Sequence, residues 1–449
     1  MEQKKRKQLL QGQRIAIGFL IIILTGTLLL MLPFATREGQ TTSLSEAMFT
    51  AVSATCVTGL VVVDTWSHWT LFGQLVILSM IQIGGLGFVT LGIGFSILLR
   101  RNIGLRERGM MQESVNALQL GGVVRLAKHI LLGTLLIEGA GAVLLTIRFL
   151  LLDGFGFFRS LYYGIFHAVS AFCNAGFDLM GFEGPYSSFV NYTGDIWFNA
   201  VITALIIIGG IGFMVWEDAM EHGLRFRRYS LHTKMVLTMT GFLLVSGTVL
   251  FWLLERDALF AGMSLRESLL GAWFSSVTAR TAGFNTVDTT GLSAGSRLLT
   301  IMLMFIGGSP GSTAGGIKTT TIFVMLLYTW ATVRGREDCS IYGRRLPSEA
   351  IRKATVVLTL NLLLALTAML VIFAGQELAF GDICFEAFSA IGTVGMSTGV
   401  TRQLSGLSRV AIMILMYGGR VGSMSFALSF LSSKKQAPVR LPQAPVSIG

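Results

Sequence analysis

The sequence has few residues of the kinds that build metal centres, disulfide frameworks or soluble surfaces. Its 449 residues include four cysteines and five histidines, and only 13% of them are charged. A soluble protein carries about 25% charged residues. The cysteines (Cys56, Cys173, Cys339 and Cys384) have neither metal-ligand nor disulfide-framework spacing, and the histidines are scattered. These absences argue against a metalloenzyme, a redox protein and a disulfide-stapled secreted domain.

What the sequence does have is a series of long apolar runs. They recur from one end of the chain to the other, at Ile15–Met31, Leu71–Leu99, Val201–Trp216 and Ala354–Ala374. A helix that crosses the ~30 Å hydrocarbon core of a bilayer needs about 20 such residues. The sequence therefore predicts a multi-pass integral membrane protein embedded in lipid.

The net charge of +11 marks topology rather than a nucleic-acid partner. Of the 35 Lys and Arg residues, 24 lie in five segments that separate pairs of apolar runs: 1–14, 100–128, 216–234, 334–353 and 434–440. Basic loops close to membrane spans stay in the cytoplasm. We therefore expect a protein of the cell (plasma) membrane with both termini in the cytosol. The first apolar run is too long for a signal peptide and has no small-x-small cleavage site, so we expect it to remain as a helix.

One short motif occurs four times. In each copy an aromatic residue precedes a glycine by ten positions, with small residues between them, at Phe49–Gly59, Phe166–Gly176, Trp273–Gly283 and Phe385–Gly395. The four glycines lie 117, 107 and 112 residues apart. Four repetitions in the same register predict an internal fourfold repeat.

Each motif lies between two apolar spans, which defines the predicted architecture. The first spans are 14–33, 124–151, 234–254 and 351–374, and the second spans are 70–99, 195–216, 296–333 and 406–431. A motif of ~10 apolar residues is too short to cross a bilayer and suits a re-entrant loop that lines a wet cavity. We expect an all-α fold with eight transmembrane helices and four pore loops around one pore. The predicted units are 1–13 (basic cytosolic N-terminus), 14–105, 124–222, 234–333 and 350–433 (repeats 1 to 4) and 434–449 (cytosolic tail).

Each second span also carries a pair of adjacent glycines. The pairs are Gly84-Gly85, Gly209-Gly210, Gly307-Gly308 and Gly418-Gly419. Their equal depth favours a shared bend or crossing below the pore loops. The alternative is close helix packing, because glycine is common in membrane helices.

The four loops suit the coordination of a cation by backbone carbonyl groups. Such groups can replace the hydration shell of an ion in a narrow pore, and the loops carry no ring of acidic side chains that would indicate another kind of cation channel. We expect the coordinating oxygens to come from four short segments. These are Val57, Thr58 and Gly59; Asn174, Ala175 and Gly176; Thr281, Ala282 and Gly283; and Thr393, Val394 and Gly395.

The same loops resemble those of the Trk/Ktr/HKT superfamily of cation transporters. The resemblance rests on Thr55–Gly59 (TCVTG), Phe172–Gly176 (FCNAG), Arg280–Gly283 (RTAG) and Gly392–Gly395 (GTVG), and it spans nearly the whole chain. In that family each loop holds one glycine, and serine in the first loop accompanies sodium selectivity. Gly59 therefore implies potassium as the transported ion.

The resemblance also implies partners. The chain looks most like the membrane (B) subunit of a bacterial Ktr system, which implies a homodimer and a cytosolic ring of nucleotide-binding regulatory subunits of the Ktr A type. Sodium as an activator stays open. No nucleotide is expected in this chain, because the stretch Gly311–Thr319 lacks the glycine before Lys318 that a phosphate-binding loop needs, and it follows a membrane span instead of a strand.

The second span of repeat 3 is interrupted at mid-membrane depth. Ile306–Thr319 contains five glycines and a proline, so no straight helix runs through it. We expect a flexible gating loop under the filter, as the family resemblance also implies; a kinked helix filled in by its neighbours is the alternative. The expected gating residues are Gly308, Ser309, Pro310, Gly311, Ser312, Thr313, Ala314, Gly315 and Gly316.

Two arginines fall within the membrane. Arg420 follows a glycine pair at the depth of the interrupted span, and we expect it to line the pore and raise the barrier for ions when the gate is shut. The alternative is a structural arginine that caps helix carbonyls. Arg280 stands in the third loop, and we expect it to point away from the ion and to brace the loop against Glu386, Asp288 or Glu138.

Three other functions compete with potassium conduction. The first is a sodium-selective or sodium-coupled transporter of the same fold. An intramembrane enzyme would need paired carboxylates, a metal cluster or an activated nucleophile within the spans, and the sequence offers none of these. A purely structural scaffold would not explain four aligned loops.

Overall fold

The computed structural model describes residues 11–37, 42–101, 103–114, 121–336, 338–422 and 442. Most of the predicted N-terminal segment, the tail 434–449 and the last part of the fourth second span lie outside the described residues.

Four long apolar helices form the first span of each repeat. Each carries an 18-residue stretch with a mean hydropathy of at least 1.9 and no more than two charged residues. Their ends agree with the predicted spans within three residues. They are α1 (Gln11–Leu30), α7 (Val123–Leu152), α11 (Leu231–Glu255) and α15 (Ser348–Gly375).

A shorter helix follows each long one at the place of the repeated motif. These four helices have 13 to 16 residues: α2 (Leu44–Cys56), α8 (Phe157–Phe172), α12 (Leu265–Thr278) and α16 (Phe380–Gly392). Two of them begin with the same capping box. Ser43 with Glu46 starts α2, and Ser264 with Glu267 starts α12, so each serine accepts a backbone N–H that would otherwise be left without a partner.

The second spans of repeats 1 and 2 are bent, as the glycine pairs favoured, although the sequence analysis did not give the site or the size of the bend. α4 (Leu71–Leu86) and α5 (Phe88–Leu98) meet at 93°, and α9 (Ile196–Gly210) and α10 (Phe213–His222) meet at 96°. The helices of each bent pair lie in the predicted spans 70–99 and 195–216, although α10 continues to His222. At the two breaks Gly87 has φ +78° and Gly212 has φ +97°, which is backbone that L side chains rarely adopt.

The second span of repeat 3 is interrupted as the sequence predicts. α13 (Ala294–Phe305) ends at Phe305, and α14 (Thr319–Val333) begins only at Thr319. In repeat 4, α17 (Gly406–Val421) is the described part of the second span. Counting each bent pair as one span, the described residues contain six helical segments long and apolar enough to cross a membrane.

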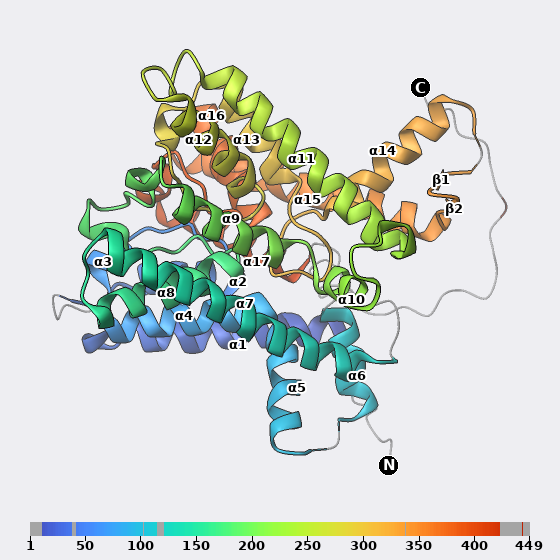
Figure 1. Ribbon diagram of the computed structural model, residues 1–449, viewed down its shortest axis with the longest axis horizontal. Coiled ribbons are helices and arrows are strands. Elements are labelled where there is room, and N and C mark those ends of the chain that lie inside the picture. The colour runs from blue at the N-terminus through green and yellow to red at the C-terminus, as the bar shows by residue number, and fades with distance from the viewer. Residues whose placement is uncertain are drawn as a thin grey trace.

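The segments that link the repeats gather at one end of the molecule. In Figure 1, α6, α10 and the β1–β2 hairpin lie toward the right-hand end and α3 lies at the left-hand end. The linking segments 100–128, 216–234 and 334–353 carry 16 of the 35 Lys and Arg residues. The remaining elements are η1 (Pro33–Ala35), α3 (Thr65–His68), α6 (Leu105–Ser114), η2 (Met180–Phe182), η3 (Val190–Tyr192), η4 (Phe226–Arg228), η5 (Thr289–Gly291), β1 (Ser340–Ile341), β2 (Arg344–Arg345) and η6 (Val400–Gln403).

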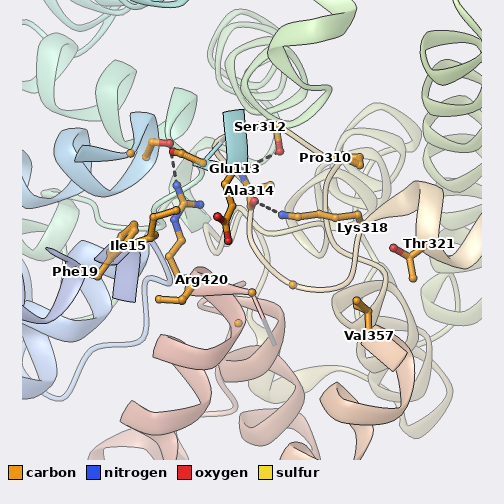
Figure 2. Close-up of a pocket in the computed structure, with 18 of the residues that line it drawn as sticks. Ile15, Phe19, Glu113, Pro310, Ser312, Ala314, Lys318, Thr321, Val357 and Arg420 are labelled. Atoms are coloured by element: carbon orange, nitrogen blue, oxygen red, sulfur yellow. Dashed lines mark hydrogen bonds between the residues drawn. The ribbon is translucent and has the colours of Figure 1, made fainter. Parts of the chain in front are cut away.

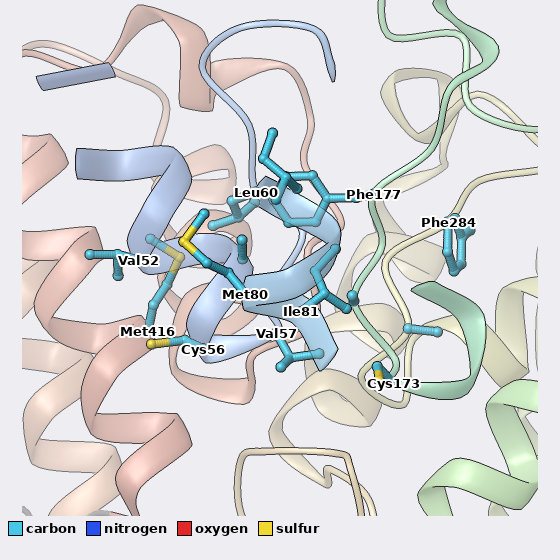
Figure 3. Close-up of a cluster of buried hydrophobic side chains, with 14 of the residues drawn as sticks. Val52, Cys56, Val57, Leu60, Met80, Ile81, Cys173, Phe177, Phe284 and Met416 are labelled. Atoms are coloured by element: carbon cyan, nitrogen blue, oxygen red, sulfur yellow. The ribbon is translucent and has the colours of Figure 1, made fainter. Parts of the chain in front are cut away.

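The largest hydrophobic core surrounds the four loops. Figure 3 shows Val57 and Leu60 of the first loop close to Met80 and Ile81 of α4, with Phe177 from the second loop beside them. Side chains from all four repeats belong to this core, which is dry and closely packed around the loop backbones.

A largely buried cluster of three charged side chains lies within repeat 2, at the end of α7. Nη1 of Arg148 lies 2.6 Å from Oδ1 of Asp153, and its Nε lies 2.5 Å from Oδ2 of Asp195. Asp195 also caps the start of α9. Its guanidinium carbon lies 4.7 Å from the ring centre of Tyr192. The side chain of Arg148 is only 8% exposed, so the two aspartates compensate a charge that water does not.

We expect Arg148→Leu to lower the free energy of unfolding by about 3 kcal/mol, because it leaves two carboxylates buried without their cation. The thermal unfolding midpoint of the detergent-solubilised protein measures this loss. Arg256→Leu is the matched control, since the Arg256–Asp257 pair is exposed, and its midpoint should stay close to that of the unmodified protein. Equal midpoints for the two variants would contradict the role given to Arg148.

Candidate functional site

The four loops that follow the short helices share one backbone pattern. In each loop a residue with positive φ stands two positions before the motif glycine, which itself has positive φ. The first residues are Val57 (+56°), Asn174 (+58°), Thr281 (+76°) and Thr393 (+50°). Three of these are β-branched, and such residues rarely adopt this conformation, so the loops hold strained backbone of the kind that gathers at functional sites.

Hydrogen bonds turn the N–H groups of these loops back toward the short helices. In loop 1, Thr58 N donates to Ser53 O at 2.8 Å and Gly59 N donates to Ser53 Oγ at 3.1 Å. In loop 4, Val394 and Gly395 make the same two bonds to Ser389, at the same distances. In loops 1 and 4 these N–H groups are therefore bonded within their own repeat.

In loops 2 and 3 a hydroxyl group of the short helix bonds the chain just after the glycine instead. Ser170 Oγ donates to Phe177 O at 2.6 Å, and Thr278 Oγ1 donates to Phe284 O at 2.7 Å. The four loops thus fall into two structural pairs, 1 with 4 and 2 with 3.

The four motif glycines form a closed ring. A methyl group placed on Gly59 would lie 2.6 Å from Ala175 O, and one on Gly395 would lie 2.1 Å from Thr58 O. A methyl group on Gly176 would lie 2.9 Å from Ala282 O, and one on Gly283 would lie 2.4 Å from Val394 O. Each loop thus places the carbonyl before its glycine against the glycine of a neighbouring loop, and only glycine fits at the four positions.

A cavity of about 430 Å³ opens above this ring. All four motif glycines line it, together with the acidic residues Asp64, Asp178, Glu183 and Asp288 and the basic residue Arg402. Burial raises the pKa of Asp178 to about 7, so this carboxyl group gains its charge only near neutral pH. The mouth of the ring is accordingly more acidic than basic.

The glycine pairs of the second spans bring these helices against the ends of the short helices. A methyl group would lie 2.0 Å from Thr55 O if added to Gly84, 1.9 Å from Phe172 O if added to Gly209, and 2.2 Å from Ile391 O if added to Gly419. The three carbonyls occupy the same motif position. Close packing is therefore what these glycines provide, and in repeats 1 and 2 the bend follows two or three residues later, at Gly87 and Gly212.

The interrupted segment of repeat 3 lies directly beneath the loops. Thr313 Oγ1 donates to Phe172 O at 3.0 Å, and Ser309 N donates to Gly210 O at 2.9 Å. A methyl group on Gly315 would lie 2.1 Å from Thr393 Oγ1. The predicted gating residues Gly308–Gly316 therefore contact loop 4 and the end of α8, although the sequence alone could not say which repeats they would touch.

Two cationic side chains hold the carbonyl groups of this segment. Arg420 donates to Thr313 O of repeat 3 and to Gly84 O and Gly85 O of repeat 1, the two repeats that neighbour its own. Lys318 Nζ donates to Ala314 O at 2.6 Å and to Gly315 O at 3.1 Å. Arg420 thus lies beside the segment 308–316 and also caps carbonyls at the end of α4, so its contacts are compatible with both interpretations given for it. Lys318 was considered only as part of a rejected phosphate-binding loop.

A second cavity, of about 380 Å³, opens on the other side of the segment. Figure 2 shows Pro310, Ser312 and Ala314 at its wall, with Lys318 and Arg420 reaching toward the segment from either side. The four-glycine ring and the segment 308–316 therefore lie between two cavities.

The expectation that Arg280 pairs with one of three acidic residues is wrong. Arg280 is buried, but its only hydrogen bond is a long one, 3.5 Å from Nη2 to Thr240 Oγ1, and among the described residues its Nε has no partner. The three candidate acids are used elsewhere. Glu386 accepts from Ser397 and Thr401, Asp288 accepts from Thr290 and Glu138 accepts from Gln82.

Several buried polar groups behind the loops were not assigned by sequence reasoning. His167 Nδ1 donates to Tyr163 O at 2.8 Å and its Nε2 accepts from Leu179 N at 3.1 Å, so one neutral tautomer satisfies both nitrogens. Glu386 holds the chain after loop 4 in the same way, through Ser397 and Thr401. The signal in the sequence was position, because both residues directly follow the aromatic residue of their motif.

Comparison with known proteins places this geometry in a family. A family model described as "Cation transport protein" (TrkH) matches residues 5–438. The potassium/sodium uptake protein NtpJ of Enterococcus hirae is 38% identical, over all of this chain and 99% of the relative. The Ktr system potassium uptake protein B of Bacillus subtilis is 40% identical, over 97% of this chain and 96% of the relative.

The fold is similar to that of a solved transporter. The crystal structure of the potassium transporter TrkH from Vibrio parahaemolyticus superposes with a TM-score of 0.68 over 95% of this chain and 86% of the other. The two sequences are 20% identical, so this likeness concerns the fold alone.

We expect Arg280→Met to raise the free energy of unfolding by about 1 kcal/mol or more, and therefore to raise the thermal unfolding midpoint. The reason is that a buried guanidinium without a carboxylate costs solvation energy that a methionine of similar length does not. Arg148→Leu provides the contrast, since that arginine has two acidic partners. A loss of stability for Arg280→Met as large as that for Arg148→Leu would mean that Arg280 has a strong partner after all.

Proposed function

We infer the function of this chain from its family, because it belongs to the TrkH/Ktr family of cation transport proteins. It is therefore a membrane transport protein and not an enzyme. Our proposal is that it forms the potassium-selective, channel-like membrane subunit of a bacterial potassium uptake system. In this proposal the chain crosses the membrane eight times, with four re-entrant loops and both termini in the cytosol.

The observation that carries the proposal is the closed ring of glycines and carbonyl groups. Carbonyls from four loops come together at one place between two cavities, and in loops 1 and 4 the N–H groups are bonded to the short helices. Carbonyl rings of this kind replace the hydration shell of a cation in a selective pore. We assign the filter to the three residues that end at each motif glycine.

Potassium is favoured over sodium by the glycine in the first loop and by the relatives. Gly59 stands where family members with sodium selectivity have serine. Two of the relatives are named as potassium uptake proteins of the Ktr system. A second candidate is sodium transport through the same fold, which the printed name of the relative from Enterococcus hirae, a potassium/sodium uptake protein, favours.

We propose that the segment Gly308–Gly316 is the gate. It contacts the loops from below, and its carbonyls at Thr313, Ala314 and Gly315 are bonded by Arg420 and Lys318. Two positive charges beneath the ring raise the energy of a cation in the path. In this proposal the gate opens when the segment and Arg420 move apart.

The proposed partners follow from the relatives. The Ktr-system names imply a multi-subunit assembly, and we propose a homodimer of this chain on a cytosolic ring of nucleotide-binding subunits. The basic segments at the right-hand end of Figure 1 would face that ring. Sodium as an activator is compatible with this assembly.

The filter is tested by Gly59→Ser in a bacterium that lacks its own potassium uptake. A side chain at Gly59 meets Ala175 O at 2.6 Å on backbone with φ +93°, so the ring must shift. We expect wild type to restore growth at limiting potassium, and Gly59→Ser to lower the ratio of rubidium to sodium uptake about tenfold, a change of ~1.4 kcal/mol in relative ion energy.

Gly241→Ser is the control for this experiment. Gly241 lies on α11 with open space around it, so this variant should transport like wild type. If wild type with a regulatory subunit fails to restore growth, the potassium proposal is wrong and sodium transport moves ahead.

The gate is tested by Arg420→Ala. Removing this cation frees the carbonyls of Thr313, Gly84 and Gly85, and we expect potassium flux to rise about fivefold. Patch-clamp recording of the reconstituted protein measures the flux. Arg409→Ala, on the same helix but bonded to Ser45 of α2, should leave the flux unchanged. Unchanged flux in a folded Arg420→Ala protein would remove Arg420 from the gate.

A further inference from the structure

The helix that links repeats 1 and 2 reaches the inner cavity. Met111 of α6 is fully buried, and Thr90 of α5 donates to its sulfur at 3.5 Å. At the end of α6, a methyl group placed on Gly87 would lie 3.1 Å from Ser114 Oγ. The C-terminal end of α6 is therefore wedged against the bend between α4 and α5, close to the central axis.

This wedge places Glu113 among positive charges. Glu113 lines the inner cavity together with Lys318, Lys353 and Arg420, and among the described residues that line it Glu113 carries the only carboxylate. In the view of Figure 2 the Glu113 carboxyl group lies between the side chains of Arg420 and Lys318. A cation that leaves the gate toward the cytosol must cross this cavity.

Two of the three positive charges, Arg420 and Lys318, are held in place by uncharged groups, so their field on a passing cation persists, whereas the charge of Lys353 is partly compensated. Arg420 and Lys318 are bonded to backbone carbonyls, which carry no net charge to cancel theirs. Lys353 lies 2.8 Å from Glu349 on the exposed side of α15. Glu113 is partly buried, which raises the pKa of its carboxyl group. Partial burial also strengthens the action of its charge on nearby cations, because the local dielectric is lower than in water.

We propose that Glu113 is an electrostatic positioning residue for the ion that leaves the gate. Its carboxylate offsets the field of Arg420, Lys318 and Lys353 and gives the cation a favourable position in the inner cavity. The proposal rests on the proposed cation conduction through this path. It adds a role for the linker helix α6, which becomes part of the conduction path instead of a connection between repeats.

The role is tested by rubidium uptake with the full assembly in the potassium-uptake-deficient bacterium. We expect Glu113→Gln to lower the maximal uptake rate about fivefold, because the inner cavity loses its negative charge. The external concentration for half-maximal uptake should change less than twofold, since the outer cavity and the ring are unaffected. Glu107→Gln is the matched control on the same helix, because its side-chain oxygen can still accept from Gly104 N, and its rate should equal that of wild type.

Charge compensation separates an electrostatic role from a structural one. The double variant Glu113→Gln with Lys353→Gln also removes a positive charge from the wall of the inner cavity. It should therefore restore at least half of the wild-type rate of rubidium uptake. Glu113→Asp keeps the charge and should transport like wild type. Immunoblots of membranes normalise each rate to the amount of protein.

Three results would overturn the proposal: a wild-type rate for Glu113→Gln, a double variant no faster than Glu113→Gln, or a Glu113→Asp protein as slow as Glu113→Gln. Failure of the wild-type chain to take up rubidium would instead reject the proposed conduction itself. The two failures are therefore distinguishable within one experiment.

Discussion

The structure depends on one steric constraint, the close approach of four backbone segments around an axis. Where the loops meet, a single methyl group would overlap a carbonyl oxygen of the next loop. The same constraint extends outward, because Gly84, Gly209 and Gly419 let the second spans contact the carbonyls that end the short helices. Glycine is needed at these places because each contact is between backbone atoms, which cannot move aside as a flexible side chain can. The result is a ring in which the carbonyl oxygen of each loop lies against the glycine of its neighbour.

The charges within the membrane follow from this ring. Beneath the ring, Arg420 and Lys318 donate to backbone oxygens of the segment 308–316. Arg148 is compensated by two aspartates, whereas Arg280 has only a long hydrogen bond to Thr240. The charges of these three arginines are thus compensated in different ways: by carbonyl groups at Arg420, by carboxylates at Arg148 and hardly at all at Arg280. The inner cavity adds a fourth arrangement, in which a carboxylate from the linker helix lies among several cations.

Much of the architecture could be predicted from the sequence because it repeats. The four long helices end within three residues of the predicted spans, and the short helices lie at the four motifs. The interruption before Thr319 was visible in its glycines and proline. The glycine pairs favoured a bend of the second spans, but its site in repeats 1 and 2, at the third glycine Gly87 or Gly212, was not predicted. Hydropathy could not reveal these bends, because both halves of each bent pair are apolar.

The sequence by itself determined the class of protein, the number of repeats and the identity of the four glycines, because each of these is written in local composition and in register along the chain. Only the tertiary structure decided which groups meet across repeats. It placed loop carbonyls against the glycines of neighbouring loops, left Arg280 without an acidic partner among the described residues and brought Glu113 to the wall of the inner cavity. The physical reason is that membrane spans signal their existence through burial in lipid, which depends on each segment alone. Contacts between distant side chains depend instead on helix rotation and bending, and no periodicity in the sequence encodes these.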